Sequence, residues 1–203
     1  MQLAISFRNL SLSVATASFL LAGAAFAEQS SIVGVNARLD HTISSGTATD
    51  GQIVAVKLDR PVKTVDGVDL PRGTQLEGTI THVQASANGG PASVSLVFNK
   101  AQLKDGKQIP VKVTLLGAYP PGQMQASNYG DEEMGPAPRH VNPRERILQE
   151  PGMLSHVSMI SSVQGQNSAT FRKKDGNFSL HAGTYFQLGI GLTGIQATHH
   201  QAS

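Results

Sequence analysis

Alternation of apolar and polar residues is the feature of this 203-residue chain that most restricts its fold. Apolar side chains recur at every second position in four well separated stretches, 31–40, 74–83, 108–117 and 185–192. Successive side chains of a β-strand point to opposite faces, so each stretch predicts a strand with one buried and one solvated face. Helical periodicity is nearly absent from these stretches. The pattern predicts an all-β fold, an antiparallel β-barrel or sandwich.

Asp-Gly pairs mark the corners of this predicted sheet. They occur at 50–51, 66–67, 105–106 and 175–176, each beside strand-like sequence. A two-residue type I′ turn requires positive φ at both central positions, which Asp tolerates and Gly adopts readily. We therefore expect hairpins of this type at the last three pairs, and a further hairpin tip at 89–91.

One of these corners occurs twice. The sequence "DGVDLPRGTQLEGTI" at 66–80 is echoed by "DGNFSLHAGTYFQLGI" at 175–190. Each copy has an Asp-Gly turn, a short apolar run, a Gly-Thr pair and an alternating strand. The Gly of the Gly-Thr pair is expected to supply a backbone angle or a close approach that a side chain would forbid. The copies are either two ordinary β corners or two related halves of one closed barrel, and the sequence leaves both open.

The segment 1–27 has the form of an export signal. Arg8 precedes an apolar stretch that ends in Ala25-Phe26-Ala27, a small-x-small cleavage motif. The apolar stretch is shorter than the roughly 20 residues needed to cross a bilayer, which favours a removed signal peptide over a membrane anchor. The mature chain then runs from 28 to 203, a length that suits one domain, exported to the periplasm or the outer membrane.

Cysteine content and charge exclude several classes of protein. The chain has no cysteine, so it has neither disulfides nor a lipid-attachment site, and its stability must come from burial and backbone pairing. Removal of Arg8 with the signal leaves 15 basic and 14 acidic residues, with both signs scattered. No basic stripe is interleaved with aromatics, so nucleic-acid binding is not expected. No later segment predicts a transmembrane helix, although peripheral membrane association stays open, as does the oligomeric state.

The middle of the chain differs in composition from the rest. Residues 117–153 carry six of the ten prolines and few apolar residues, which predicts a long loop insertion. Inside it, Asn142-Pro143-Arg144-Glu145 fits a helix N-cap, so "PRERILQE" predicts a short helix that ends at Pro151. The predicted segments are a signal peptide at 1–27, a first barrel part at 28–116, the loop at 117–153, closing strands at 154–195 and a flexible tail at 196–203.

No constellation of residues predicts a catalytic, cofactor-binding or metal site. The seven histidines lack ligand spacing, so surface or satisfied histidines are preferred over a zinc site. The run Asp131-Glu132-Glu133 indicates a solvated acidic patch, because calcium loops place their ligands at alternate positions. His156 lies among the serines of "LSHVSMISS", but no Gly-x-Ser-x-Gly elbow and no orienting group accompany it. We therefore predict a protein that is not an enzyme, with a hydrolase as the weaker alternative.

A succession of turns and strands runs through 35–115. Its members are Leu39 with Ile43-Ser44, a strand at 53–58, Pro71-Arg72-Gly73-Thr74 with Leu76 and Gly78, a strand at 94–98, and Asp105-Gly106. This succession resembles the C-terminal β-barrel domain of TrbI-like proteins, which are outer-membrane core components of type IV secretion and conjugation machines. The later "LHAGTYFQLGI" resembles that family's closing strand, and the likeness covers about 32–116 and 168–192.

The resemblance implies a barrel in the bacterial envelope, with an envelope or secretion-related protein as partner. Family members have a cytoplasmic tail, an inner-membrane helix and a proline-rich spacer before the barrel, whereas only a cleavable signal is expected here. They also insert an amphipathic helical hairpin that helps form an outer-membrane pore, at about the place of 117–153 in this chain. That stretch is too polar to line such a pore. The resemblance thus implies a stand-alone exported barrel with a structural or protein-interaction role.

A carbohydrate-binding or adhesion module is the alternative function. Such modules stack exposed aromatics on sugar faces. The chain has no tryptophan and only three tyrosines, Tyr119, Tyr129 and Tyr185. For the protein-interaction role, the expected working surfaces are exposed sheet edges, which accept a partner strand, and the loop at 117–153.

Overall fold

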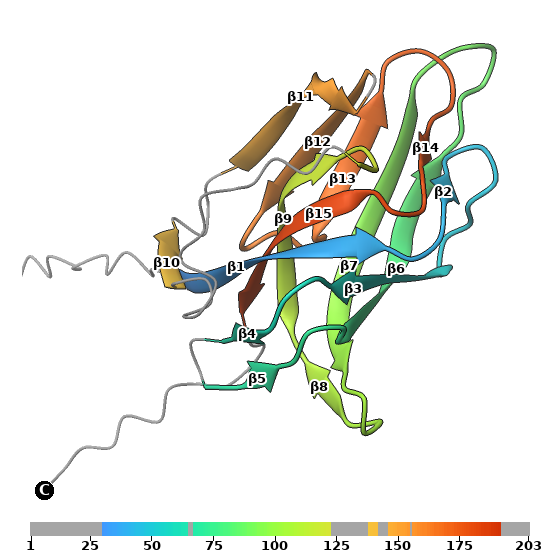
Figure 1. The fold of residues 1–203 in the computed structure, drawn as a ribbon. Coiled ribbons are helices and arrows are strands. Elements are labelled where there is room, and N and C mark those ends of the chain that lie inside the picture. The colour runs from blue at the N-terminus through green and yellow to red at the C-terminus, as the bar shows by residue number, and fades with distance from the viewer. Residues whose placement is uncertain (1–29, 65–66, 123–137, 142–145, 155, 192–203) are drawn as a thin grey trace, which may run out of the picture.

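The structure is a computed structural model that describes residues 30–64, 67–122, 138–141, 146–154 and 156–191. The predicted signal peptide, the tail, the acidic run at 131–133 and Tyr129 lie outside these residues. Every regular element in the described part is a β-strand (Figure 1). The strands are β1 (Ser30–Leu39), β2 (Ile43–Ser44), β3 (Ile53–Leu58), β4 (Val62–Lys63), β5 (Asp69–Leu70), β6 (Gln75–Gln84), β7 (Ala92–Gln102), β8 (Gln108–Pro110), β9 (Lys112–Tyr119), β10 (Pro138–Val141), β11 (Arg146–Leu154), β12 (Val157–Ser162), β13 (Ala169–Lys173), β14 (Ser179–Leu180) and β15 (Tyr185–Gly191).

Eleven of the described strands form one antiparallel sheet that is nearly closed into a barrel (Figure 1). The order is β11-β12-β13-β7-β6-β3-β1-β15-β9, with β10 beside β1 and β8 beside β7. Two short ribbons, β2 with β14 and β4 with β5, lie at opposite ends of the molecule. The predicted all-β antiparallel architecture is confirmed.

Side chains bridge the seam between the two ends of this sheet, β9 and β11. The Gln149 carboxamide accepts a hydrogen bond from the Ala118 amide and donates one to the Ala118 carbonyl, each at 2.6 Å. The Ser161 hydroxyl on β12 donates to the Leu115 carbonyl at 2.5 Å. Because β9 is the last strand of the ladder, these bonds satisfy backbone groups that would otherwise lack a partner. They also occupy backbone groups at the edge of β9, so this edge is less available to a partner strand than we expected from the sequence.

One hydrophobic core fills the interior. The three phenylalanines Phe98, Phe171 and Phe186 are fully buried at its centre. The Phe186 ring lies 6.4 Å from that of Phe98 and 5.9 Å from that of Phe171, centroid to centroid. Phe186 comes from β15 and Phe98 from β7, which are separated by three strands in the sheet order. The contact therefore crosses the barrel interior and holds its two walls together.

The repeated corner has the same backbone hydrogen bonds in both copies. In each, the Gly amide donates to a leucine carbonyl and the leucine amide donates to the Thr carbonyl, at 2.8 to 3.0 Å: Gly73 and Thr74 bond to Leu58, and Gly183 and Thr184 bond to Leu39. The φ angles of the two glycines are +82° and +81°, a region that favours glycine. The expectation of a special backbone angle at these positions is confirmed.

The correspondence extends beyond the corner to an approximate two-fold relation between β1 and β3. These strands pair antiparallel, with Arg38 opposite Lys57. If Arg38 is taken as equivalent to Lys57, the same offset in residue number makes β1 equivalent to β3 and β2 equivalent to β4. If Gly73 is taken as equivalent to Gly183, the corresponding offset makes β5 equivalent to β14 and β6 equivalent to β15. The strand pairing agrees with this equivalence. The long strand β1 pairs with β15 as β3 pairs with β6, and the short strand β2 pairs with β14 as β4 pairs with β5.

An irregularity of the sheet repeats at the same place. The register of β6 with β7 shifts between Glu77 and Gly78, and that of β15 with β9 shifts between Gln187 and Leu188. Glu77 and Gln187 lie equally far along the chain from the corner glycine of their own copy. A β-bulge is a specific feature of a strand pair, so its presence at the same place in both copies is further evidence, beside the shared hydrogen bonds, that the copies are equivalent. Strands β1, β2, β14 and β15 are therefore structurally equivalent to β3, β4, β5 and β6, in that order.

The Asp-Gly hairpins differ from the predicted turn type. At Asp105-Gly106 the β7–β8 hairpin is present, but among its residues only Gly106 has a positive φ. The Gly106 amide donates to the Leu103 carbonyl and the Leu103 amide donates to the Lys107 carbonyl, which is a three-residue loop with a glycine bulge. The β4–β5 hairpin at Gly67 has the same bonding, from Gly67 to Thr64 and from Thr64 to Val68, while Asp66 lies outside the described residues.

The type I′ turn occurs elsewhere, at the β6–β7 tip. Asn88 and Gly89 both have positive φ, at 51° and 76°, and the Gly90 amide donates to the Ala87 carbonyl. The hairpin tip predicted at 89–91 is thus confirmed.

The hairpin predicted at Asp175-Gly176 is wrong. The strands on its two sides, β13 and β14, belong to different sheets. Instead, the Gly176 amide donates to the carbonyls of Gly89 and Gly90. Gly176 therefore docks this connection on the β6–β7 tip, at the point where the chain passes from one sheet to the other.

The helix predicted for 143–150 is also wrong where the structure describes it. Residues 146–150 belong to β11, and 142–145 lie outside the described residues. Ile147 and Gln149 are partly buried, whereas Leu148 between them is 61% exposed, which is the alternation of a strand. Pairing with β12 and the seam bonds of Gln149 outweigh the local N-cap signal. Parts of 117–153 thus belong to the barrel wall.

Candidate functional site

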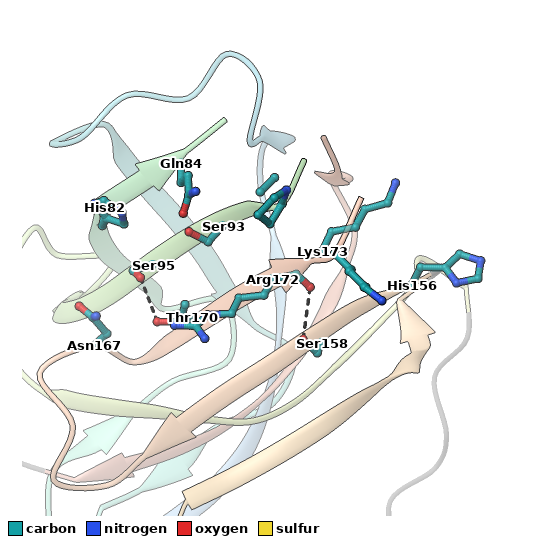
Figure 2. A pocket seen from close by; sticks show the side chains of 13 residues that line it. His82, Gln84, Ser93, Ser95, His156, Ser158, Asn167, Thr170, Arg172 and Lys173 are labelled. Atoms are coloured by element: carbon teal, nitrogen blue, oxygen red, sulfur yellow. Dashed lines mark hydrogen bonds between the residues drawn. The ribbon is translucent and has the colours of Figure 1, made fainter. Parts of the chain in front are cut away.

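A groove of about 780 Å³ is the candidate site of the described structure. It lies on the outer face of the sheet, over β6, β7, β13 and β12 (Figure 2). Four adjacent strands from two distant parts of the sequence, 75–102 and 157–173, build it. Each contributes the polar members of its alternating pattern, while the apolar members face the core.

Two rows of side chains cross these strands and form the floor and walls of the groove. The first row is His82, Ser95 and Thr170, and the second is Gln84, Ser93, Arg172 and Ser158. Small side chains occupy β7 in the middle, and larger ones stand on β6 on one side and β13 on the other. The difference in side-chain size makes this face concave.

The floor is made of hydroxyl groups. The Ser95 and Thr170 hydroxyls share a hydrogen bond of 2.9 Å across β7 and β13. Ser93 and Ser95 are only 9% and 5% exposed because the flanking side chains rise over them. Each hydroxyl has both a donor and two acceptor positions, so the floor keeps hydrogen-bonding capacity for a ligand.

A bulge in β6 places His82 on this face. The β6–β7 register shifts between Ile80, which opposes Leu96, and His82, which opposes Ser95. The extra residue, Thr81, reverses the alternation, so His82 turns outward although Leu76 and Ile80, also at even positions, are buried. The Asp50 carboxylate accepts a hydrogen bond of 2.7 Å from the Val83 amide and holds the strand beyond the bulge.

The groove is cationic. Arg172, Lys173 and Lys174 line it, and no Asp or Glu is among its lining residues. The Lys173 ammonium donates to the Asn177 carbonyl at 3.1 Å, which fixes it at the rim. Within the described ranges, the single ion pair lies outside the groove and joins Arg38 on β1 to Asp59, directly after β3, at 3.0 Å. The Arg172 guanidinium therefore has no carboxylate partner among the described residues, and its field is available to an anion.

Two of the dispersed histidines line the groove at opposite sides, and they do not form a metal centre. His82 and His156 lie on two different walls of the groove. Across the part of the chain that the structure describes, no group of three His, Asp or Glu could hold a metal ion. His156 is exposed, has a φ of +70°, and stands near serines but beside no lining carboxylate. A Ser-His-acid triad therefore cannot be built from the lining residues.

Aromatic side chains do not contribute to the groove. Tyr119 is partly buried on β9, and Tyr185 lies under the Arg38 guanidinium, 4.7 Å from ring centroid to the central carbon. Neither lines the groove, and Tyr129 lies outside the described residues. Among the described residues, the groove thus has no tyrosine or phenylalanine platform on which a sugar ring could stack.

A comparison with protein-family models and a comparison with curated proteins each found no match. The resemblance to TrbI-like barrels therefore stays a prediction from the residues quoted above. In the described residues no helix is long and apolar enough to span a bilayer.

Sequence reasoning did not find the residues of the groove. Ser93 and Ser95 are the polar members of the alternating stretch "ASVSLVF", and Thr170 and Arg172 are those of "ATFRK". The alternation shows that these side chains face away from the core. It does not show that β7 and β13 are neighbours, and that neighbourhood is what makes a site of them.

Proposed function

We propose that this protein is a non-enzymatic, exported β-barrel module that binds another protein in the bacterial periplasm or at the outer membrane. The observation that carries the proposal is the cationic groove on a rigid sheet face, with hydrogen-bonding groups on its floor and no carboxylate among its lining residues. Such a surface is equipped for recognition, because it offers hydrogen-bond donors and positive charge, while no lining carboxylate accompanies either of its histidines. The signal-like sequence at 1–27 supports the envelope as its place of work.

The barrel is proposed to be a stand-alone relative of the TrbI-like C-terminal domain. Support comes from the order of turns and strands in 35–115 and from the antiparallel barrel built on them. In this proposal the partner is an envelope or secretion-related protein. A carbohydrate-binding role is less favoured, since none of the tyrosines and phenylalanines that the structure describes lines the groove.

Site-specific photocrosslinking in intact cells tests the proposal. A photoreactive residue replaces Gln84, an exposed member of the groove wall, and in a matched variant it replaces Lys57, an exposed residue of β3 outside the groove. We expect an envelope protein to crosslink through position 84 and not through position 57. Absence of a crosslink from position 84, in cells where the chain is present in the envelope, would contradict the proposal.

Export is tested with the same cells. If 1–27 is a signal peptide, the protein recovered from the periplasm or envelope begins at Glu28. Recovery of a chain with Met1 intact from the cytoplasm would contradict this part.

A further inference from the structure

We infer that the groove over β6, β7, β13 and β12 binds an acidic segment of the protein partner, with the Arg172 guanidinium pairing with its carboxylates. The inference rests on the proposed function for the existence of a protein partner, and it specifies the chemistry of that partner. Its basis is the combination of an open polar groove, an arginine in the second row without a carboxylate partner among the described residues, and the lack of any carboxylate among the lining residues.

The position of Arg172 suits it for this role. It opposes Ser93 on β7 and Ser158 on β12, so it stands within the second row and not at the rim. Figure 2 shows its side chain extending over the floor toward Thr170. The strand under it is held by the Ser158 hydroxyl, which donates to the Arg172 carbonyl at 3.3 Å. The guanidinium is therefore anchored at its backbone while its side chain is exposed.

Guanidinium and hydroxyl groups together match a carboxylate. The planar guanidinium offers parallel N–H donors that fit both oxygens of one carboxylate, which an ammonium group cannot do. The neighbouring hydroxyls of Ser93 and Thr170 can donate to oxygens that the arginine leaves free. Lys174 adds a second exposed cation to the lining. A segment with several carboxylates would gain from all of these groups at once.

Size and composition favour a peptide segment over other anions. A volume of about 780 Å³ holds a short segment and not a whole protein face. Anionic sugars would lack an aromatic platform here. The balance of 16 basic and 14 acidic residues over the chain does not provide the extended basic surface that nucleic-acid backbones require.

Titration of the ¹⁵N-labelled exported protein with two synthetic peptides tests the inference. The probe is acetyl-Gly-Glu-Gly-Glu-Gly-Glu-Gly-amide, and the control peptide has Gln in place of each Glu. We expect the Glu peptide to shift the amide signals of Ser93, Ser95, Thr170 and Arg172, and the Gln peptide to bind at least about tenfold more weakly. Raising NaCl from about 0.1 M to about 1 M shortens the screening length from about 10 Å to about 3 Å, so the Glu peptide should bind more weakly.

Two arginine variants separate the groove from general charge. Arg172→Gln should weaken binding of the Glu peptide roughly three- to tenfold, and Arg172→Lys should fall between that variant and the wild type. The control is Arg72→Gln, which removes the same charge from an exposed corner outside the groove. Equal losses for Arg172→Gln and Arg72→Gln would overturn the inference, as would signal shifts centred outside the groove. Tighter binding of a sulfated disaccharide than of the Glu peptide would also overturn it and would assign the groove to anionic sugars.

The inference and the proposed function fail separately. If the envelope partner still crosslinks through position 84 after Arg172→Gln, with undiminished yield, the acidic-segment inference is wrong while the proposed function stands. If the Glu peptide binds in the groove but no envelope protein crosslinks there, the chemistry of the groove is supported while the proposed envelope role fails.

Discussion

Alanine in place of the glycine at each repeated corner should destabilise the barrel to nearly the same extent. Gly73 and Gly183 have φ angles of +82° and +81°. An added Cβ would meet Lys104 Cε at 3.8 Å at the first site and Pro121 Cβ at 3.7 Å at the second, both ordinary contacts. Steric clash is therefore absent at both, and the loss comes from forcing an L-residue into the left-handed region. That strain is about 1–2 kcal/mol for each site.

Urea unfolding followed by far-UV circular dichroism measures the loss in the free energy of unfolding. For a domain of roughly 150–250 residues, 1 kcal/mol corresponds to about 2–4 °C in Tm, so each variant should lower Tm by about 2–8 °C. The two sites lie in different copies of the corner and share no hydrogen-bond partner, so their effects should add in the double variant.

Asparagine at the same positions is the matched control. It tolerates positive φ better than alanine does, so Gly73→Asn and Gly183→Asn should each lose less stability than the alanine variants. Equal losses for asparagine and alanine would show that backbone strain is not the cause. A large loss at one corner with none at the other would refute the structural equivalence of the two copies.

Two further predictions concern the closure and the core of the barrel. Gln149→Ala removes both hydrogen bonds to Ala118, so it should lower the free energy of unfolding by about 1–3 kcal/mol. It should also speed hydrogen exchange of the Ala118 amide, and an unchanged exchange rate would contradict these bonds across the seam. Phe186→Ala leaves a cavity at the fully buried centre of the aromatic cluster and should lower the free energy of unfolding in urea by about 3–5 kcal/mol. The control, Phe186→Leu, should lose less stability. A loss below about 1 kcal/mol for the alanine variant would argue against the contact across the barrel.

The sequence was sufficient to predict the class of fold because alternation is a local property. Each long strand shows its buried face in its own residues, as Leu76 and Ile80 do in β6. The special glycine corners were also predictable, since the backbone angle at Gly73 and Gly183 depends on residues close in the chain. One local signal of the two-fold relation was missed. "ARLDHTI" at 37–43 and "VKLDRPV" at 56–62 occupy equivalent places in β1–β2 and β3–β4.

The groove could not be predicted because its residues meet only through the strand order of the barrel. Ser95 and Thr170 are 75 residues apart in the chain and hydrogen-bond to each other. A single extra residue at Thr81 decides whether His82 faces the groove or the core, and no sequence rule placed a bulge there. The false helix at 143–150 has a similar cause, because the local N-cap signal cannot anticipate the pairing of β11 with β12.

Engineered disulfides test most directly that β7 and β13 lie side by side and form the floor of the groove. The chain has no cysteine, so a pair of introduced cysteines has no competitor. The Ser95 and Thr170 hydroxyl oxygens are 2.9 Å apart, whereas Ile160 opposes Thr170 from the far side, one strand further from Ser95. Under mild oxidation, Ser95→Cys with Thr170→Cys should form an internal disulfide, and Ser95→Cys with Ile160→Cys should keep free thiols. A disulfide in the second variant and free thiols in the first would contradict the strand order on which the groove depends.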